Sequence, residues 1–291
     1  MRTVHRPGRI IGVLAASLML AACSLVTLGY NSLPLLTFGW LDGYIDFDDT
    51  QAPRVREDLA RLHQWHRAHE LPRYAALLQQ MEQLAPGEPT AAQACAVYDS
   101  GRRHLLALAE RAEPMIVSTA LSLQPAQLAH LAQRFQRRDE EWRRDWVERS
   151  PGQRQDKRIT QSTERLERLY GRLEPAQRQV LREQVARSVF DPQRVLAERQ
   201  RRQADLLETL RRLQAPALPL QEARQLWRGF MARTQASPDA NWQRHAQALT
   251  QEQCALFAAV HAAASPAQRE AAAARLRSWR QDLAALAPQQ P

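Results

Sequence analysis

The chain has 291 residues, with 40 lysines and arginines against 31 acids and a formal net charge of +9. Ten glycines and a shortage of Val, Ile, Tyr and Thr runs exclude a strand-rich fold, so we expect an all-α protein. The basic charge would ordinarily suggest nucleic acid, but interspersed Arg and Glu are typical of solvated helix faces.

The N-terminal segment, residues 1–22, has the pattern of a secretory signal. Three arginines and no acid precede an uncharged run over residues 10–22, which is too short to span a bilayer. The run ends in Leu20-Ala21-Ala22-Cys23, which resembles the lipobox of bacterial lipoproteins. This resemblance implies cleavage before Cys23, lipid on its sulfur and an acylated amino group. Ser24 at the next position points to the outer membrane. Export then removes nucleic acid as a partner and leaves the membrane, envelope polyanions and envelope proteins.

Residues 23–46 predict a lipidated tether leading into a short membrane-proximal helix. The segments Tyr30-Asn31, Trp40 to Phe47, Trp65-His66-Arg67 and Glu70 to Tyr74 are similar to an uncharacterised family of proteobacterial lipoproteins of unknown function. The resemblance is strongest from Tyr30 to Ala76, supports the fold and the anchor, and implies no activity.

Four predicted helix starts share one pattern, in which an apolar residue is followed four positions later by glutamine. They are Phe47 to Gln51, Leu123 to Gln127, Leu173 to Gln177 and Leu249 to Gln253. Glutamine at the third helical position reaches back to the backbone N–H of the cap residue. Thr250 with Gln253 and Ser265 with Gln268 form complete capping boxes in this prediction.

The four glutamines are separated by 76, 50 and 76 residues, which predicts a tandem duplication. We therefore expect an elongated multi-helix array of two halves, residues 47–171 and 172–291. The first half is predicted to hold helices over residues 48–70, 73–85, 89–112, 114–121, 124–149 and 155–171. The second is predicted to hold helices over residues 174–189, 192–214, 219–235, 238–248, 251–263 and 265–286.

Cys95 and Cys254 are the two cysteines left once Cys23 carries lipid. In an oxidising compartment they form a disulfide between the early and late parts of the chain, or they are two small buried hydrophobic residues. Both alternatives remain open at this point.

Leu249-Thr250-Gln253 resembles the LTxxQ motif of the Spy and CpxP type of periplasmic chaperones, while the other three starts lack threonine in the cap position. The resemblance implies a helical cradle for unfolded envelope proteins or for a sensor. The expected function is therefore that of an outer-membrane lipoprotein facing the periplasm, with a helical binding surface that serves as a chaperone or an adaptor.

His63, His66 and His69 lie three residues apart on a predicted helix, followed by Glu70. Imidazoles so spaced can bind Zn²⁺ or Cu²⁺, which makes a metal or ligand binder, or an unrecognised enzyme, the alternative function. A solvated histidine row is favoured, because the pattern lacks a second motif histidine and Pro72 ends the predicted helix. The sequence carries no catalytic or cofactor fingerprint, so we expect neither an enzyme nor a cofactor.

Overall fold

The computed structural model describes residues 27–287, which form helices and short loops with no strand among them. The all-α prediction is confirmed for this part of the chain. The elements are α2 (Leu33–Ile45), α3 (Gln51–Leu84), α4 (Ala91–Ser122), α5 (Pro125–Trp142), the π-helical turn η1 (Arg143–Val147), α6 (Pro151–Tyr170), α7 (Pro175–Ala186), α8 (Pro192–Leu213), α9 (Leu220–Gln235), α10 (Ala240–Ala262) and α11 (Pro266–Leu286).

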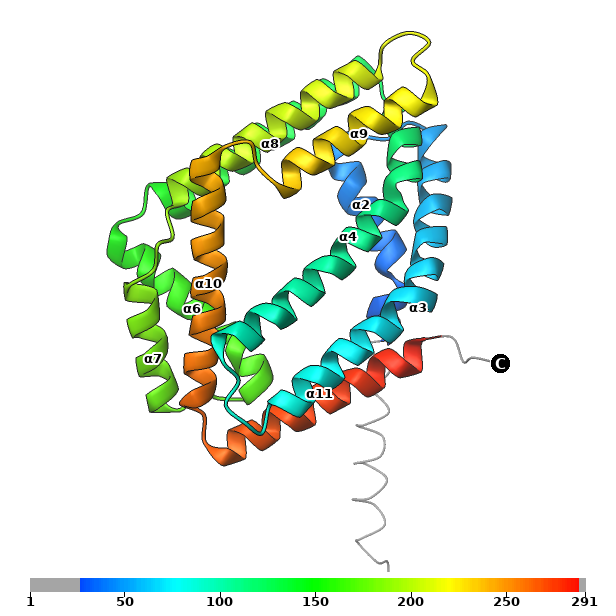
Figure 1. Cartoon of the computed structure of the whole chain (residues 1–291). Coiled ribbons are helices and arrows are strands. Elements are labelled where there is room, and N and C mark those ends of the chain that lie inside the picture. Colours follow the sequence, from blue (N-terminus) through cyan, green and yellow to red (C-terminus); the bar gives the residue numbers. More distant parts are fainter. Residues whose placement is uncertain (1–26, 288–291) are drawn as a thin grey trace, which may run out of the picture.

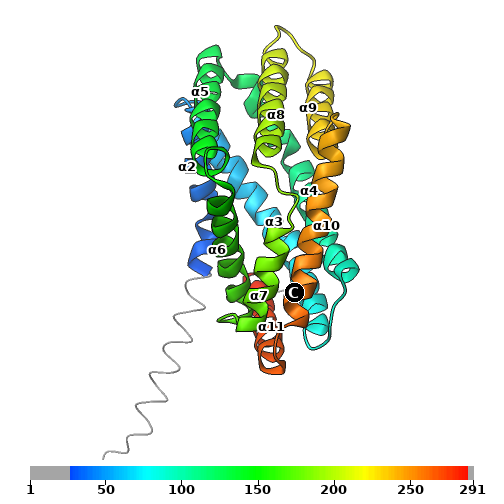
Figure 2. The same cartoon turned by 90° about the vertical axis from the view of Figure 1, so that its left-hand side faces the viewer.

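The helices form an elongated array that closes on itself as a four-sided frame (Figure 1). The second half of α3 and α11 lie along one side, and α8 and α9 lie along the opposite side. The helices α6, α7 and α10 form a third side, α2 and the first half of α3 form the fourth, and α4 crosses the frame diagonally. Figure 2 shows the frame from one edge, with α5 and α6 on one face and α9 and α10 on the other.

Two prolines lie inside helices, where the sequence predicted breaks. The predicted helices 48–70 and 73–85 are the single helix α3, and those at 89–112 and 114–121 are the single helix α4. Pro72 and Pro114 each remove one backbone hydrogen bond and favour a bend. The middle of α3 changes direction in Figure 1. Leu71 is only 2% exposed and Val117 is fully buried, so core packing next to each proline offsets the lost bond.

The helix α10 likewise replaces two predicted helices, 238–248 and 251–263. The predicted helix start and capping box at Leu249 to Gln253 are therefore wrong. Thr250 lies in the middle of α10, and its hydroxyl donates to the Ala246 carbonyl at 3.0 Å. No glycine or proline interrupts residues 240–262, so nothing in this segment ends the helix.

Five other helices begin with a glutamine at the third helical position whose side chain accepts from the backbone N–H of the cap residue, and in α4, α6 and α11 the cap Thr or Ser also accepts from the glutamine N–H, which completes a capping box. These glutamines are Gln93 in α4, Gln127 in α5, Gln153 in α6, Gln177 in α7 and Gln268 in α11. The predicted box from Ser265 to Gln268 is confirmed. Proline at the first helical position accompanies four of the five, because its missing N–H has no partner to lose there.

Two corners of the frame repeat one arrangement of four helices. In the first corner α2 packs on α3 and α5, and α3 packs on α4. In the second corner α6 packs on α7 and α11, and α7 packs on α10. Each corner thus brings together the starts of two helices, which are α3 and α5 in the first and α7 and α11 in the second.

Reciprocal glutamine bonds hold the first corner together. Gln51 and Gln127 are 4% and 8% exposed, and their side-chain amides donate to each other at 3.1 and 2.7 Å. The Gln51 amide also donates to the Ser122 carbonyl at 2.8 Å, and the Gln127 amide to the Asp46 carbonyl at 2.8 Å. Each glutamine therefore lies in the first turn of one helix and binds a backbone carbonyl in the segment that precedes the other helix.

The second corner uses Gln177 and Gln268 in a related way. Gln268 Nε2 donates to the Arg172 carbonyl at 3.1 Å, and Ser265 Oγ donates to Glu174 Oε1 at 2.8 Å. The glutamine that matches Gln127 is thus Gln268, and the predicted correspondence through Gln253 is wrong because that residue begins no helix. The likeness of the corners is a property of the fold, and the tandem duplication stays a prediction.

A large hydrophobic core adjoins each corner. The first gathers side chains of α4, α5, α8 and α9 around Val117, and the second gathers those of α6, α7, α10 and α11 around Leu181 and Val260. Since α6 packs on α7 and α11, the predicted boundary at residues 171 and 172 is not a gap in the packing. All these core residues lie within residues 27–287, so a chain that begins at Ser24 retains them.

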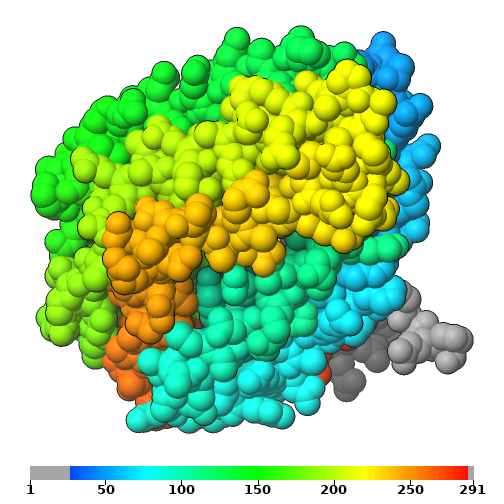
Figure 3. Space-filling view, turned by 45° about the horizontal axis from the view of Figure 1, so that its top comes forward, coloured from blue at the N-terminus to red at the C-terminus, as the bar shows by residue number. Residues whose placement is uncertain are grey.

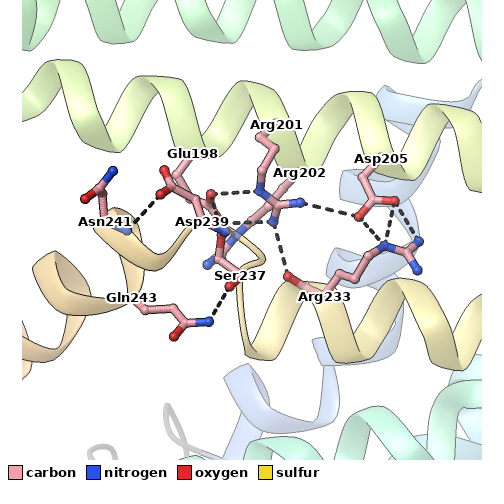
Figure 4. A network of polar contacts seen from close by, with 9 residues as sticks. All are labelled: Glu198, Arg201, Arg202, Asp205, Arg233, Ser237, Asp239, Asn241 and Gln243. Carbon is pink, nitrogen blue, oxygen red and sulfur yellow. Dashed lines mark hydrogen bonds and ion pairs between the residues drawn. The ribbon is translucent and has the colours of Figure 1, made fainter.

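A buried polar network fixes the turn between α9 and α10 to α8 (Figure 4). Glu198 is 5% exposed and accepts hydrogen bonds from Arg201 Nε at 2.8 Å, Arg202 Nε at 2.6 Å and Ser237 Oγ at 3.0 Å. Burial raises the pKa of Glu198, but these three donors outweigh it and hold the pKa below its usual value. With its oxygens occupied in this way, the carboxylate has a structural role.

Candidate binding cavities

An apolar cavity of about 370 Å³ lies between α4 and α10, with further walls from α3, α6 and α11. We call it the disulfide cavity; its lining includes Met81, Val97, Tyr98, Leu249, Phe257 and Leu276. In Figure 3 the surface is hollowed where α10 meets α4. Thr250 and Gln253 also line the cavity, so the segment that resembles the LTxxQ motif contributes to its wall without beginning a helix.

The cavity takes its name from the bond between Cys95 and Cys254. Their sulfur atoms are 2.07 Å apart, and the bond joins α4 to α10 across 159 residues of sequence. Of the two alternatives that the sequence left open, the structure contains the disulfide. Because Cys254 itself lines the cavity, the bond holds two of its walls together.

One buried histidine in the cavity wall is fully hydrogen-bonded. His261 Nε2 lies 3.0 Å from the Ala85 carbonyl and 3.1 Å from the Gly87 carbonyl, so this nitrogen carries the proton. The Tyr170 hydroxyl then donates to Nδ1 at 2.7 Å. Burial lowers the pKa of His261 and raises that of Tyr170, which keeps both groups neutral. The pair ties α6 and α10 to the loop after α3 and leaves the cavity without a free catalytic base there.

A second apolar cavity, of about 480 Å³, lies beside α2 and is called the α2 cavity below. Its lining includes Trp40, Tyr44, Met115, Phe135, Leu206 and Trp227, from α2, α4, α5, α8 and α9. Both cavities therefore offer mainly carbon surface between helices, as sites for apolar ligands do.

The histidine row is divided among different partners. His63 Nε2 lies 3.1 Å from the Tyr30 carbonyl, and the Tyr30 hydroxyl lies 2.9 Å from His66 Nδ1. Burial lowers the pKa of both imidazoles. The expectation of a solvated row is thus wrong for these two, because they bind the segment that precedes α2. His69 is exposed, and its Nδ1 lies 2.9 Å from the Trp65 carbonyl.

Glu70, the fourth candidate metal ligand, is fully buried between α3 and α4. Arg73 Nη1 donates to it at 2.8 Å, and His104 Nδ1 lies 3.1 Å from its other oxygen. Among residues 27–287, no three His, Cys, Asp or Glu side chains are grouped so that they could hold a metal ion. The metal alternative therefore has no assembled ligand set in this part of the chain.

The other predicted site residues lie in the corners or outside the described chain. Phe47, Leu123 and Leu173 pack into hydrophobic cores, next to the glutamines of their helix starts. Cys23 and the signal segment lie outside residues 27–287. Within those residues, no helix combines the length and the apolar character needed to cross a bilayer.

A family model described as "Family of unknown function (DUF6279)" matches residues 43–229, more than half of the chain. The chain belongs to this family. The match includes both glutamines of the first corner, and it includes Cys95 but not Cys254. The expectation of an uncharacterised family is confirmed. No curated protein and no solved structure matches the chain.

Of the residues that line the disulfide cavity, the sequence pattern singled out Leu249, Thr250, Gln253 and Cys254 as candidate site residues but none of the others. Tyr98 follows Cys95 by three positions, and Phe257 follows Cys254 by three, so on helices each aromatic residue lies beside its cysteine. A disulfide assumed from the start would have placed both rings at one contact between α4 and α10.

Proposed function

We propose that the protein is a lipid-anchored binding protein of the outer membrane, facing the periplasm, whose disulfide cavity receives apolar side chains of envelope polypeptides. The observation that carries this proposal is the open apolar cavity of about 370 Å³ between α4 and α10. Its volume falls within the roughly 300–1,000 Å³ of ligand-binding pockets.

The chemistry of the cavity supports binding over catalysis. Its buried histidine is neutral and has hydrogen-bond partners for both ring nitrogens, and the Thr250 hydroxyl donates to its own helix. Apolar surface without directional groups discriminates weakly between ligands, which suits a chaperone or an adaptor with several clients. The resemblance to the LTxxQ chaperones points the same way, because Leu249, Thr250 and Gln253 line this cavity.

The anchor is proposed from the lipobox-like sequence that ends at Cys23. Acyl chains contribute about 0.8 kcal/mol per buried methylene, so two or three chains hold a protein on a membrane. Such a protein meets envelope proteins and the membrane, and nucleic acid is not among its partners.

Replacing the lipidated cysteine tests the anchor. Cys23→Ala is expected to abolish incorporation of labelled palmitate and to leave uncleaved or soluble chain, because the thioether needs the cysteine sulfur. Ser24→Ala is the control and retains the label. Equal labelling of Cys23→Ala and wild type would refute the anchor.

Filling the cavity tests the binding function. Val97→Trp places an indole inside the disulfide cavity, so the affinity for an apolar fluorescent probe should fall at least about tenfold, or about 1.4 kcal/mol. Suppression of aggregation of a denatured test protein should fall with it. Leu105→Trp, on the same helix at a 62% exposed position, is the matched control and should match wild type. The proposal fails if wild type leaves aggregation unchanged at several-fold molar excess, or if Val97→Trp suppresses it equally well.

A further inference from the structure

The segment with the most exposed apolar surface lies at the N-terminal end of the described chain. Ten large hydrophobic residues are exposed among residues 27–287, and five of them lie between residues 28 and 40. These five are Leu28 (64%), Leu33 (42%), Leu35 (70%), Leu36 (61%) and Trp40 (62%). The remaining five are distributed over residues 98–220, so the exposed large hydrophobic residues are most concentrated in this segment, called the patch below.

The patch occupies the outward side of α2 and of the turn before it. Phe38, on the opposite side of the helix, is 5% exposed and packs against Val55 and Leu59 of α3. The helix packs on α3 and α5, and the five large exposed apolar residues lie away from these contacts. Figure 2 shows α2 near one edge of the molecule.

The patch itself is uncharged, and arginine side chains lie close to it. No charged residue occurs between Arg9 and Asp42, so the outward face of α2 contains none. Three arginine side chains from α3 and α5 lie over aromatic rings of α2 and of the segment before it. They are Arg56 over Phe38 at 4.0 Å, Arg67 over Tyr30 at 5.2 Å and Arg134 over Tyr44 at 5.3 Å. Guanidinium groups beside an apolar face suit anionic head groups beside acyl chains.

Chain length places the patch at the proposed anchor. Leu28 is the fifth residue after Cys23, so their Cα atoms are at most about 18 Å apart. The 13 residues of α2 span about 20 Å, too little for a hydrocarbon core of about 30 Å. A helix of this length next to a lipid lies along the membrane surface, with tryptophan at the level of the head groups.

We propose that the outward face of residues 28–40 lies in the surface of a phospholipid bilayer, as a second membrane contact beside the Cys23 lipid. The inference rests on the proposed anchor for its location. This contact orients the frame on the membrane and brings the α2 cavity, which Trp40 also lines, next to the bilayer.

The test uses lipid-free protein that begins at Ser24, which retains every described core residue. We expect it to bind vesicles of phosphatidylethanolamine and phosphatidylglycerol. The triple variant Leu35→Gln, Leu36→Gln and Trp40→Gln should have an affinity for these vesicles at least about tenfold lower, because it loses three of the five exposed apolar side chains of this segment. Brominated lipid should quench wild-type fluorescence more than that of Trp40→Phe. Leu105→Gln, Val189→Gln and Leu220→Gln, at 62%, 48% and 55% exposed positions, form the matched control and should bind like wild type.

Absence of vesicle binding by wild type, or equal binding by the α2 variant, overturns the inference. A wild-type dimer that binds no vesicles and that the α2 variant converts to monomer would assign the face to a second copy, which also overturns it. The palmitate experiment is separate, because lipid-free protein needs no acylation to bind. Binding without labelling refutes the anchor alone, and labelling without binding refutes this contact alone.

Discussion

Replacing both Cys95 and Cys254 with alanine is expected to lower the free energy of unfolding by about 3 to 5 kcal/mol. The disulfide closes a loop of 159 residues, and restricting the unfolded chain over so long a loop accounts for most of this value. Urea unfolding followed by circular dichroism measures the change. The variant should also bind the apolar probe more weakly, because its cavity walls lose their covalent link.

Reduction of the wild type provides the control. A thiol reductant should bring the wild-type midpoint to that of the double variant and should leave the variant where it was. A loss below about 1 kcal/mol, or a variant that still responds to reductant, would contradict the stabilising role of the bond.

The second large effect is expected at the first glutamine corner. Gln51→Ala should cost about 2 to 3 kcal/mol, because it removes the acceptor of the Asp48 N–H in the turn before α3 and leaves the Ser122 carbonyl and the Gln127 amide without this partner in a buried place. Gln127→Ala should cost a similar amount. The double variant should cost about 1 kcal/mol less than the sum, since both single changes break the same amide pair.

Gln93→Ala is the matched control for the corner. Gln93 likewise accepts from a backbone N–H three residues earlier, that of Thr90, but it is exposed and none of its hydrogen bonds reaches another helix. Its loss should cost about 0.5 to 1 kcal/mol. Equal effects of Gln93→Ala and Gln51→Ala, or strict additivity in the double variant, would show that the cross-corner bonds add no stability.

A helix start was predicted correctly where the sequence supplies a full set of N-terminal signals. Ser265-Pro266-Ala267-Gln268 combines a cap, a first-turn proline and a returning glutamine, and α11 begins there. In the segment Leu249 to Gln253, Thr250 and Gln253 have the same spacing as Ser265 and Gln268, but the segment lacks the proline and follows residues that already form a helix. The existing helix continued through it, since ending and restarting a helix costs several backbone bonds.

The merged helices and the cavities depend on distant parts of the chain. Pro72 would end an isolated helix, yet Leu71 beside it packs into the folded frame and favours continuation. The disulfide cavity has walls from five helices, and no local pattern in any one of them indicates a cavity. The helix starts that depend on neighbouring residues could therefore be predicted from the sequence. The continuous helices and the cavities could not, because they depend on tertiary packing.

One side of the frame pairs α3, which is synthesised early, with α11, which is synthesised last. Glu82 accepts a hydrogen bond from Arg277 Nε at 2.8 Å across 195 residues of sequence. Ribosomes add about 5 to 20 residues per second, so α11 is synthesised roughly 10 to 40 seconds after α3. During that interval the apolar surface of α3 depends on other molecules for cover. The protein, which is itself proposed to bind other polypeptides, would then need a chaperone before α11 is in place.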